Sequence, residues 1–156
     1  MGIQENLQAE EDIDNTSANY ELRITNYELR NMVVRIKISV GDKVFYAQLK
    51  NTPTAIAISN ALPIQSSANI WGDEIYFQVP AQAALEPEAK ARVNVGDLAY
   101  WPSMPAFCIF FGATPVSHDG TPVAASAVNV FGRLEKVDLE QLRSVRDGET
   151  VVIEAA

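Results

Sequence analysis

Residues 34–49, VRIKISVGDKVFYAQL, show the clearest structural pattern in the chain. Apolar side chains occupy alternate positions on both sides of a short interruption: Val34, Ile36, Ile38 and Val40 before it, and Phe45, Ala47 and Leu49 after it. A period of two is typical of a strand with one buried face. The interruption contains Gly41-Asp42, and glycine supplies the positive φ that a tight hairpin turn requires. The stretch therefore predicts a β-hairpin that contributes one face to a hydrophobic core.

Beyond the hairpin, short apolar segments alternate with turns and two short helices. Asn51 or Thr52 can cap a helix that contains Pro53 in its first turn. Asp138 can cap a second helix over about 139–145. Further strands are expected from residue 64 onward, and at 75–79, 98–101, 106–111, 128–134 and 150–154. Many short strands separated by turns favour a mainly β fold, a closed eight-stranded barrel whose open ends are covered by two short helices.

Composition excludes several classes of protein. The chain has 156 residues, 47% of them hydrophobic, which is enough for one compact core. Its net charge of −8 argues against nucleic-acid binding, which needs a basic surface. No apolar run approaches the roughly 18–20 residues that cross a bilayer, and the acidic start lacks the pattern of a secretion signal. The single cysteine excludes an intrachain disulfide, so a cytoplasmic protein is expected.

Residues 1–31 differ from the rest of the chain. They contain seven acidic residues and two arginines, and the segment 19–30 nearly repeats the heptad NYELRIT. Fewer than two heptads fall short of a coiled-coil signal. The consecutive acids between Glu10 and Asp14 are typical of a solvated tail rather than a metal site. We therefore expect a disordered acidic extension over 1–31 and a functional domain over 32–156.

Three motifs in the second half of the chain carry a resemblance to a known family. They are GDLAYWP at 96–102, FFGATP at 110–115 and VNVFG at 128–132. Together with the hairpin and the Thr52-Pro53 helix start, their order resembles the cyclophilin fold. More closely, the motifs look like those of small prokaryotic cyclophilin-like proteins, stand-alone domains of unsettled biochemical role. The resemblance covers about Val33 to Ala156 and implies a cyclophilin-like β-barrel.

The resemblance also raises the question of prolyl isomerisation. An isomerase needs an apolar slot for the proline ring and a fixed donor, usually arginine, that stabilises the twisted amide. In active cyclophilins the arginine follows a histidine after the first helix, and the corresponding stretch 66–71 contains neither. Ile109 replaces the expected glutamine, and Val128 and Asn129 replace the expected histidine. Isomerase activity is therefore not favoured, and no catalytic residue is assigned.

The sequence predicts instead a domain that binds a small molecule or short peptide in an aromatic cleft. The candidate ligand-binding residues are Tyr100, Trp101, Phe110, Phe111, Thr114, Ser126, Asn129 and Glu74. The aromatic members would supply an apolar cleft, and the others its polar anchors. The first alternative is a weak peptidyl-prolyl isomerase that uses Arg92 or Arg133. A second is a protein-interaction module, because related barrels occur in bacterial urea-carboxylase and allophanate-hydrolase machinery.

Other chemistry lacks the necessary parts. His118 is the only histidine and lies in a loop sequence, so a zinc site or a hydrolytic triad is incomplete. Cys108 lies within an apolar run, where cysteine usually acts as a small buried hydrophobe. The stretch 112–117 lacks the pattern of a phosphate-binding loop. We therefore expect no metal and no cofactor.

Overall fold

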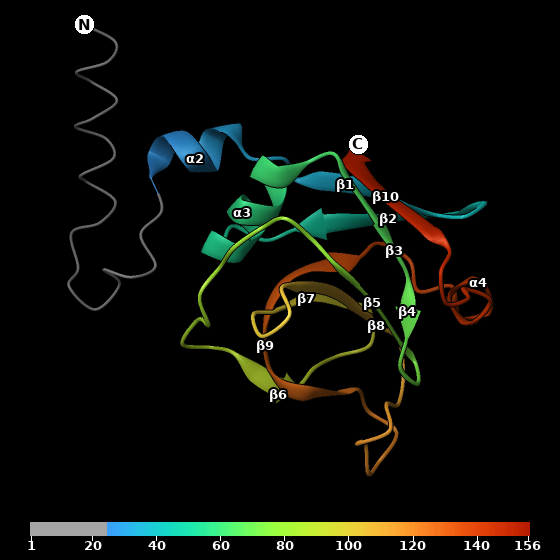
Figure 1. Ribbon diagram of the computed structural model, residues 1–156. Coiled ribbons are helices and arrows are strands. Elements are labelled where there is room, and N and C mark those ends of the chain that lie inside the picture. Colours follow the sequence, from blue (N-terminus) through green and yellow to red (C-terminus); the bar gives the residue numbers. More distant parts are fainter. Residues whose placement is uncertain (1–24) are drawn as a thin grey trace, which may run out of the picture.

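The computed structural model of the protein describes residues 25–156 (Figure 1). Three short helices lie in this range: α2 (Asn26–Asn31), α3 (Pro53–Ala61) and α4 (Leu139–Arg143). Ten strands accompany them: β1 (Arg35–Val40), β2 (Lys43–Leu49), β3 (Ile64–Ser67), β4 (Asn69–Ile70), β5 (Glu74–Gln78), β6 (Lys90–Arg92), β7 (Asp97–Trp101), β8 (Ala106–Phe110), β9 (Val123–Leu134) and β10 (Thr150–Ala155). The mainly β fold is confirmed.

The strands form one antiparallel sheet that curves around a common interior (Figure 1). Its order is β3-β10-β1-β2-β9-β7-β8-β5-β4, and β6 pairs with β9 outside this path. The two end strands, β3 and β4, are joined through Ala68, whose backbone N–H donates to the Glu149 carbonyl at 2.9 Å. Hydrogen bonds between β3 and β4 do not close the ring in the described residues, so a closed barrel is not confirmed.

The numbers of elements also differ from the prediction of eight strands and two helices. β4 and β6 contain two and three residues, which is too short for an alternating pattern to be visible in the sequence. The third helix, α2, lies within the segment expected to be an extension. Its capping box joins Thr25 and Glu28, and the helix buries none of its residues. The acidic cluster and residues 19–24 of the first heptad copy lie outside the described residues.

The predicted hairpin and helix starts are confirmed. β1 and β2 pair in register from Arg35–Gln48 to Val40–Lys43, and Gly41 turns between them with φ of 59°. The Thr52 side chain accepts a hydrogen bond from the Ala55 N–H and caps α3. The Asp138 side chain caps α4 in the same way by accepting from the Gln141 N–H.

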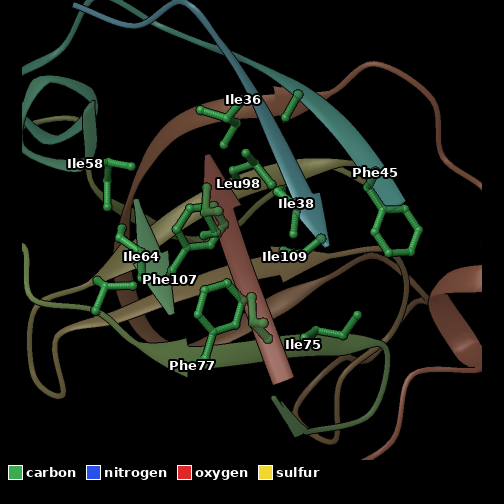
Figure 2. Close-up of a cluster of buried hydrophobic side chains, with 14 of the residues drawn as sticks. Ile36, Ile38, Phe45, Ile58, Ile64, Ile75, Phe77, Leu98, Phe107 and Ile109 are labelled. Carbon is green, nitrogen blue, oxygen red and sulfur yellow. The ribbon is translucent and has the colours of Figure 1, made fainter. Parts of the chain in front are cut away.

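Two hydrophobic clusters occupy the two faces of the strands. The larger fills the interior of the curved sheet, where the Phe107 and Phe77 rings stack at 4.9 Å (Figure 2). The Phe107 ring also meets the Phe131 ring edge-on at 5.0 Å. The smaller cluster contains Ala99, Cys108 and other residues that point away from this interior. β8 is buried at all five positions, which confirms the prediction of a strand buried on both faces.

Gly132 explains the glycine of the VNVFG motif. This buried residue pairs with Leu49 of β2 on one side and with Leu98 of β7 on the other. A Cβ at this position would lie 2.7 Å from the Gln48 carbonyl oxygen, closer than van der Waals contact allows. The motif therefore keeps three strands in close contact.

In the part of the chain that the structure describes, no helix is both long and apolar enough to span a membrane.

The interior aromatic cluster predicts a large loss of stability on truncation. Phe107→Ala should lower the free energy of unfolding by about 3–5 kcal/mol, because it removes the ring that contacts both Phe77 and Phe131. Urea denaturation measures the change. Tyr27→Ala in α2 is the control, since this side chain is half exposed and the expected change is below about 0.5 kcal/mol. A loss below about 1 kcal/mol for Phe107→Ala would contradict this description of the core.

Candidate functional site

The alternation of side chains along three neighbouring strands creates the candidate site. On β5, Ile75 and Phe77 belong to the interior cluster, so Glu74 and Tyr76 lie on the outer face of the sheet. On β7 and β8, Trp101 and Cys108 share that outer face with Tyr76. The pairing of Tyr76 with Cys108 in the β5–β8 register brings these side chains together.

These outer-face side chains line a cavity of about 320 Å³. Its walls come from the turn before β5, from β5, β7 and β8, from the turn after β7 and from the beginning of β9. The lining residues are Trp71, Glu74, Tyr76, Trp101, Met104, Cys108, Ala124, Ala125 and Val128. Both tryptophans of the chain are therefore in this cavity. The lining is mostly apolar, with a single carboxyl group.

Glu74 is the acidic residue of the cavity. The residue is 6% exposed, and it stands opposite Phe110 in the β5–β8 pairing. Burial raises the pKa of Glu74 to about 7, and a hydrogen bond from the Cys108 thiol opposes this shift in part. Burial, together with the neighbouring Glu74, raises the pKa of the Cys108 thiol well above its ordinary value. The carboxyl group can therefore change its protonation state near neutral pH.

Local hydrogen bonds fix the Trp101 side chain and the backbone of Trp71. The Trp101 Nε1–H donates to the Ser126 Oγ at 2.6 Å, which ties the end of β7 to β9. The Trp71 backbone N–H donates to the Glu74 carbonyl at 3.0 Å across the turn that precedes β5. Gly72 gives this turn a φ of 61°, and a Cβ there would lie 2.9 Å from the Ala113 carbonyl oxygen. The turn therefore depends on glycine for both conformation and space.

The structure brings only part of the predicted ligand-binding set to this cavity. Glu74 and Trp101 line the cavity. Ser126 does not line it, but its hydroxyl accepts a hydrogen bond from the Trp101 indole. Phe110 lies in the outer-face cluster but is fully buried. Tyr100 and Phe111 belong to the interior cluster, on the opposite face from Trp101.

The remaining predicted residues hold the fold together. The Tyr100 hydroxyl donates to the Ala81 carbonyl at 2.7 Å inside the protein. The Thr114 hydroxyl donates to the Val123 carbonyl at 2.5 Å and fastens the 112–122 loop to β9. The hydroxyl groups of Tyr100 and Thr114 therefore both donate to backbone carbonyl groups of the protein itself.

Asn129 lies at a different, more polar cavity of about 460 Å³. Its side chain donates to the Ala84 carbonyl at 2.8 Å and to the Thr54 hydroxyl at 3.0 Å, and accepts from the Glu86 N–H at 2.8 Å. The Glu86 carboxylate in turn accepts from the Thr54 N–H at 3.1 Å. Asn129 therefore joins the 81–89 segment, α3 and β9.

The two arginines considered for isomerisation do not line the aromatic cavity. Arg92 pairs with Asp119, and the Arg133 guanidinium lies 3.2 Å from the Asp97 carboxylate beside the more polar cavity. His118 is exposed in the 112–122 loop, and Cys108 is buried. Residues 25–156 contain no group of three or more His, Cys, Asp or Glu side chains that could hold a metal ion.

Sequence reasoning missed several lining residues, above all Tyr76, Met104 and Cys108. One signal was available. Glu74 and Tyr76 alternate with the apolar residues Ile75 and Phe77 at the predicted strand 75–79, so they are expected to share a face. The contribution of Met104 comes from a turn, and no periodic pattern extends through it.

Comparisons with known proteins agree on the fold. The family model described as cyclophilin-like matches residues 34–154. The solution structure of the hypothetical protein AF2241 from Archaeoglobus fulgidus is 43% identical, with a TM-score of 0.68 over 80% of this chain and 96% of that one. The structure of McbB in complex with tryptophan is 12% identical, with a TM-score of 0.57 over 76% of this chain and 44% of McbB, and shows similarity of fold alone. The search of curated proteins gives no match.

Glu74 predicts a loss of stability with rising pH. Its pKa is raised from an ordinary value of 4.5 to about 7, so the folded state retains a proton that the unfolded state releases. The resulting stabilisation is complete below the unfolded pKa and is lost as the pH rises through the folded pKa. We expect the free energy of unfolding to fall by about 2 kcal/mol between pH 5 and pH 8. Urea denaturation at the two pH values measures it.

Glu74→Gln provides the control, because the amide has nearly the same shape and does not titrate. This part of the pH dependence should be absent from the variant. A decrease of the same size in the variant would show that other groups cause it.

Proposed function

We propose that this chain, which belongs to the cyclophilin-like family, binds a small molecule or the side chain of a short peptide in the outer-face aromatic cavity. The observation that carries the proposal is the position of Trp71, Tyr76 and Trp101 around one cavity. Aromatic side chains of a monomeric domain are usually buried in its core, and exposed apolar surface that forms a concave site is typical of ligand binding.

The size and polarity of the cavity indicate the kind of ligand. Its volume of about 320 Å³ lies at the lower end of the range for ligand sites, which suits a single ring with a short substituent. The apolar lining would contact the ring, and Glu74 would orient a polar group. Ser126 acts indirectly by holding the Trp101 indole.

Weak prolyl isomerisation is the alternative, and the lining of the cavity favours binding over catalysis. An isomerase must donate a strong hydrogen bond to the twisted amide. Among the described residues that line the cavity there is no arginine, lysine, histidine, asparagine or glutamine. A role as a protein-interaction module remains a third alternative.

Binding can be followed by the fluorescence of the protein itself, since both tryptophans line the cavity. We expect 2-phenylethanol, a neutral single-ring probe, to change the tryptophan emission with saturation. Ala125→Phe should weaken binding by about tenfold or more, because the new ring would occupy the cavity. Ala84→Phe is the matched control at an exposed alanine outside the cavity, and its affinity should stay within about twofold. Equal affinities in the two variants would contradict binding at this site.

A protease-coupled assay with a short alanine-proline peptide tests the alternative. We expect the rate of cis–trans isomerisation to equal the uncatalysed rate, because no positively charged donor is among the described residues that line the cavity. An acceleration that Ala125→Phe abolishes and Ala84→Phe retains would favour the isomerase.

A further inference from the structure

We propose that the ligand of the aromatic cavity is an organic monocation, with its ammonium group beside the Glu74 carboxylate and its apolar part among Trp71, Tyr76 and Trp101. This inference rests on the proposed function and specifies the charge of the ligand. It follows from the position of Glu74, from the aromatic lining and from the other charged groups of the cavity.

Glu74 differs from the other buried acidic residues of residues 25–156. Asp97 has the Arg133 guanidinium at 3.2 Å, and Glu86 accepts hydrogen bonds from the N–H and the hydroxyl of Thr54. The Glu74 carboxyl group accepts a hydrogen bond from the Cys108 thiol, which is a weak donor. A buried carboxylate without a positive partner is unfavourable, and a cation delivered by a ligand would supply the missing charge.

The aromatic lining favours the same kind of ligand. The faces of indole and phenol rings carry partial negative charge, and they attract an organic cation within about 6 Å. Trp71, Tyr76 and Trp101 surround the cavity that contains Glu74, and the Met104 thioether adds a polarizable group. Aromatic faces and a carboxylate together stabilise positive charge, whereas an apolar cavity alone would favour a neutral ligand.

No positively charged side chain is among the described residues that line the cavity. The titratable side chains that line the cavity are Glu74 and Tyr76 from β5 and Cys108 from β8. The described lining residues from β7, from β9 and from the turns carry no charge. Asp73, next to Glu74, lies 3.2 Å from Arg143, so this nearby cation already has a carboxylate partner. An anionic ligand would meet an acidic group and no cation.

Three probes of nearly equal shape test the inference by tryptophan fluorescence at pH 8: 2-phenylethylammonium, 2-phenylethanol and phenylacetate. We expect the ammonium compound to bind about tenfold more tightly than the alcohol, and phenylacetate to bind more weakly than either. In Glu74→Gln the ratio of ammonium to alcohol affinity should fall to about one. Circular dichroism checks that the variant is folded.

The pH dependence of the wild-type protein gives a second measurement that needs no variant. Because the cation binds the ionised carboxylate, its affinity should rise by about tenfold from pH 6 to pH 8. The ammonium probe stays protonated over this range, so the change reports on the protein. The affinity of the alcohol should not rise.

The outcomes separate this inference from the function on which it rests. Tighter binding of the alcohol or of phenylacetate, or an ammonium affinity that does not rise with pH, would overturn the cation assignment and leave ligand binding in place. If none of the three probes binds, the proposed function fails as well. A preference for the cation that persists in Glu74→Gln would also overturn the role assigned to this carboxyl group.

Discussion

Burial of the central strands on both faces is the constraint on which the rest of the structure depends. β7 and β8 are covered on one side by the larger interior cluster and on the other by the smaller cluster. Each side chain on these two strands therefore belongs either to the interior cluster or to the smaller outer cluster. Side chains of consecutive residues point to opposite faces of the sheet. This rule places Phe107 at the centre of the core and the adjacent Cys108 in the wall of a cavity.

The same rule sets how much of the molecule could be predicted from sequence. The hairpin, the cap at Thr52 and the doubly buried strand could be predicted, because local patterns specify them. The candidate site could be predicted only in part. Tyr100 and Trp101 look like one aromatic group in the sequence, yet the strand directs them to opposite faces. The bend at Ala68 that joins the two end strands leaves no periodic signal, because it depends on long-range hydrogen bonds.

Glu74 connects stability with the proposed function. The carboxyl group of the buried residue Glu74 is unfavourable in its charged form, and an apolar residue would fill this position at lower cost. Its position among aromatic side chains is explained if a ligand satisfies the charge. The surrounding hydrogen bonds, from the turn at Gly72 to the contact between Trp101 and Ser126, fix the walls of the cavity. A site prepared in this way loses less entropy on binding.

Nuclear Overhauser effects between bound 2-phenylethylammonium and the protein test the central claim most directly, because they identify the face of the sheet that holds the ligand. The account predicts contacts from the probe ring to the indole protons of both Trp71 and Trp101. Contacts to Tyr100 or Phe111, whose side chains belong to the interior cluster, would contradict it.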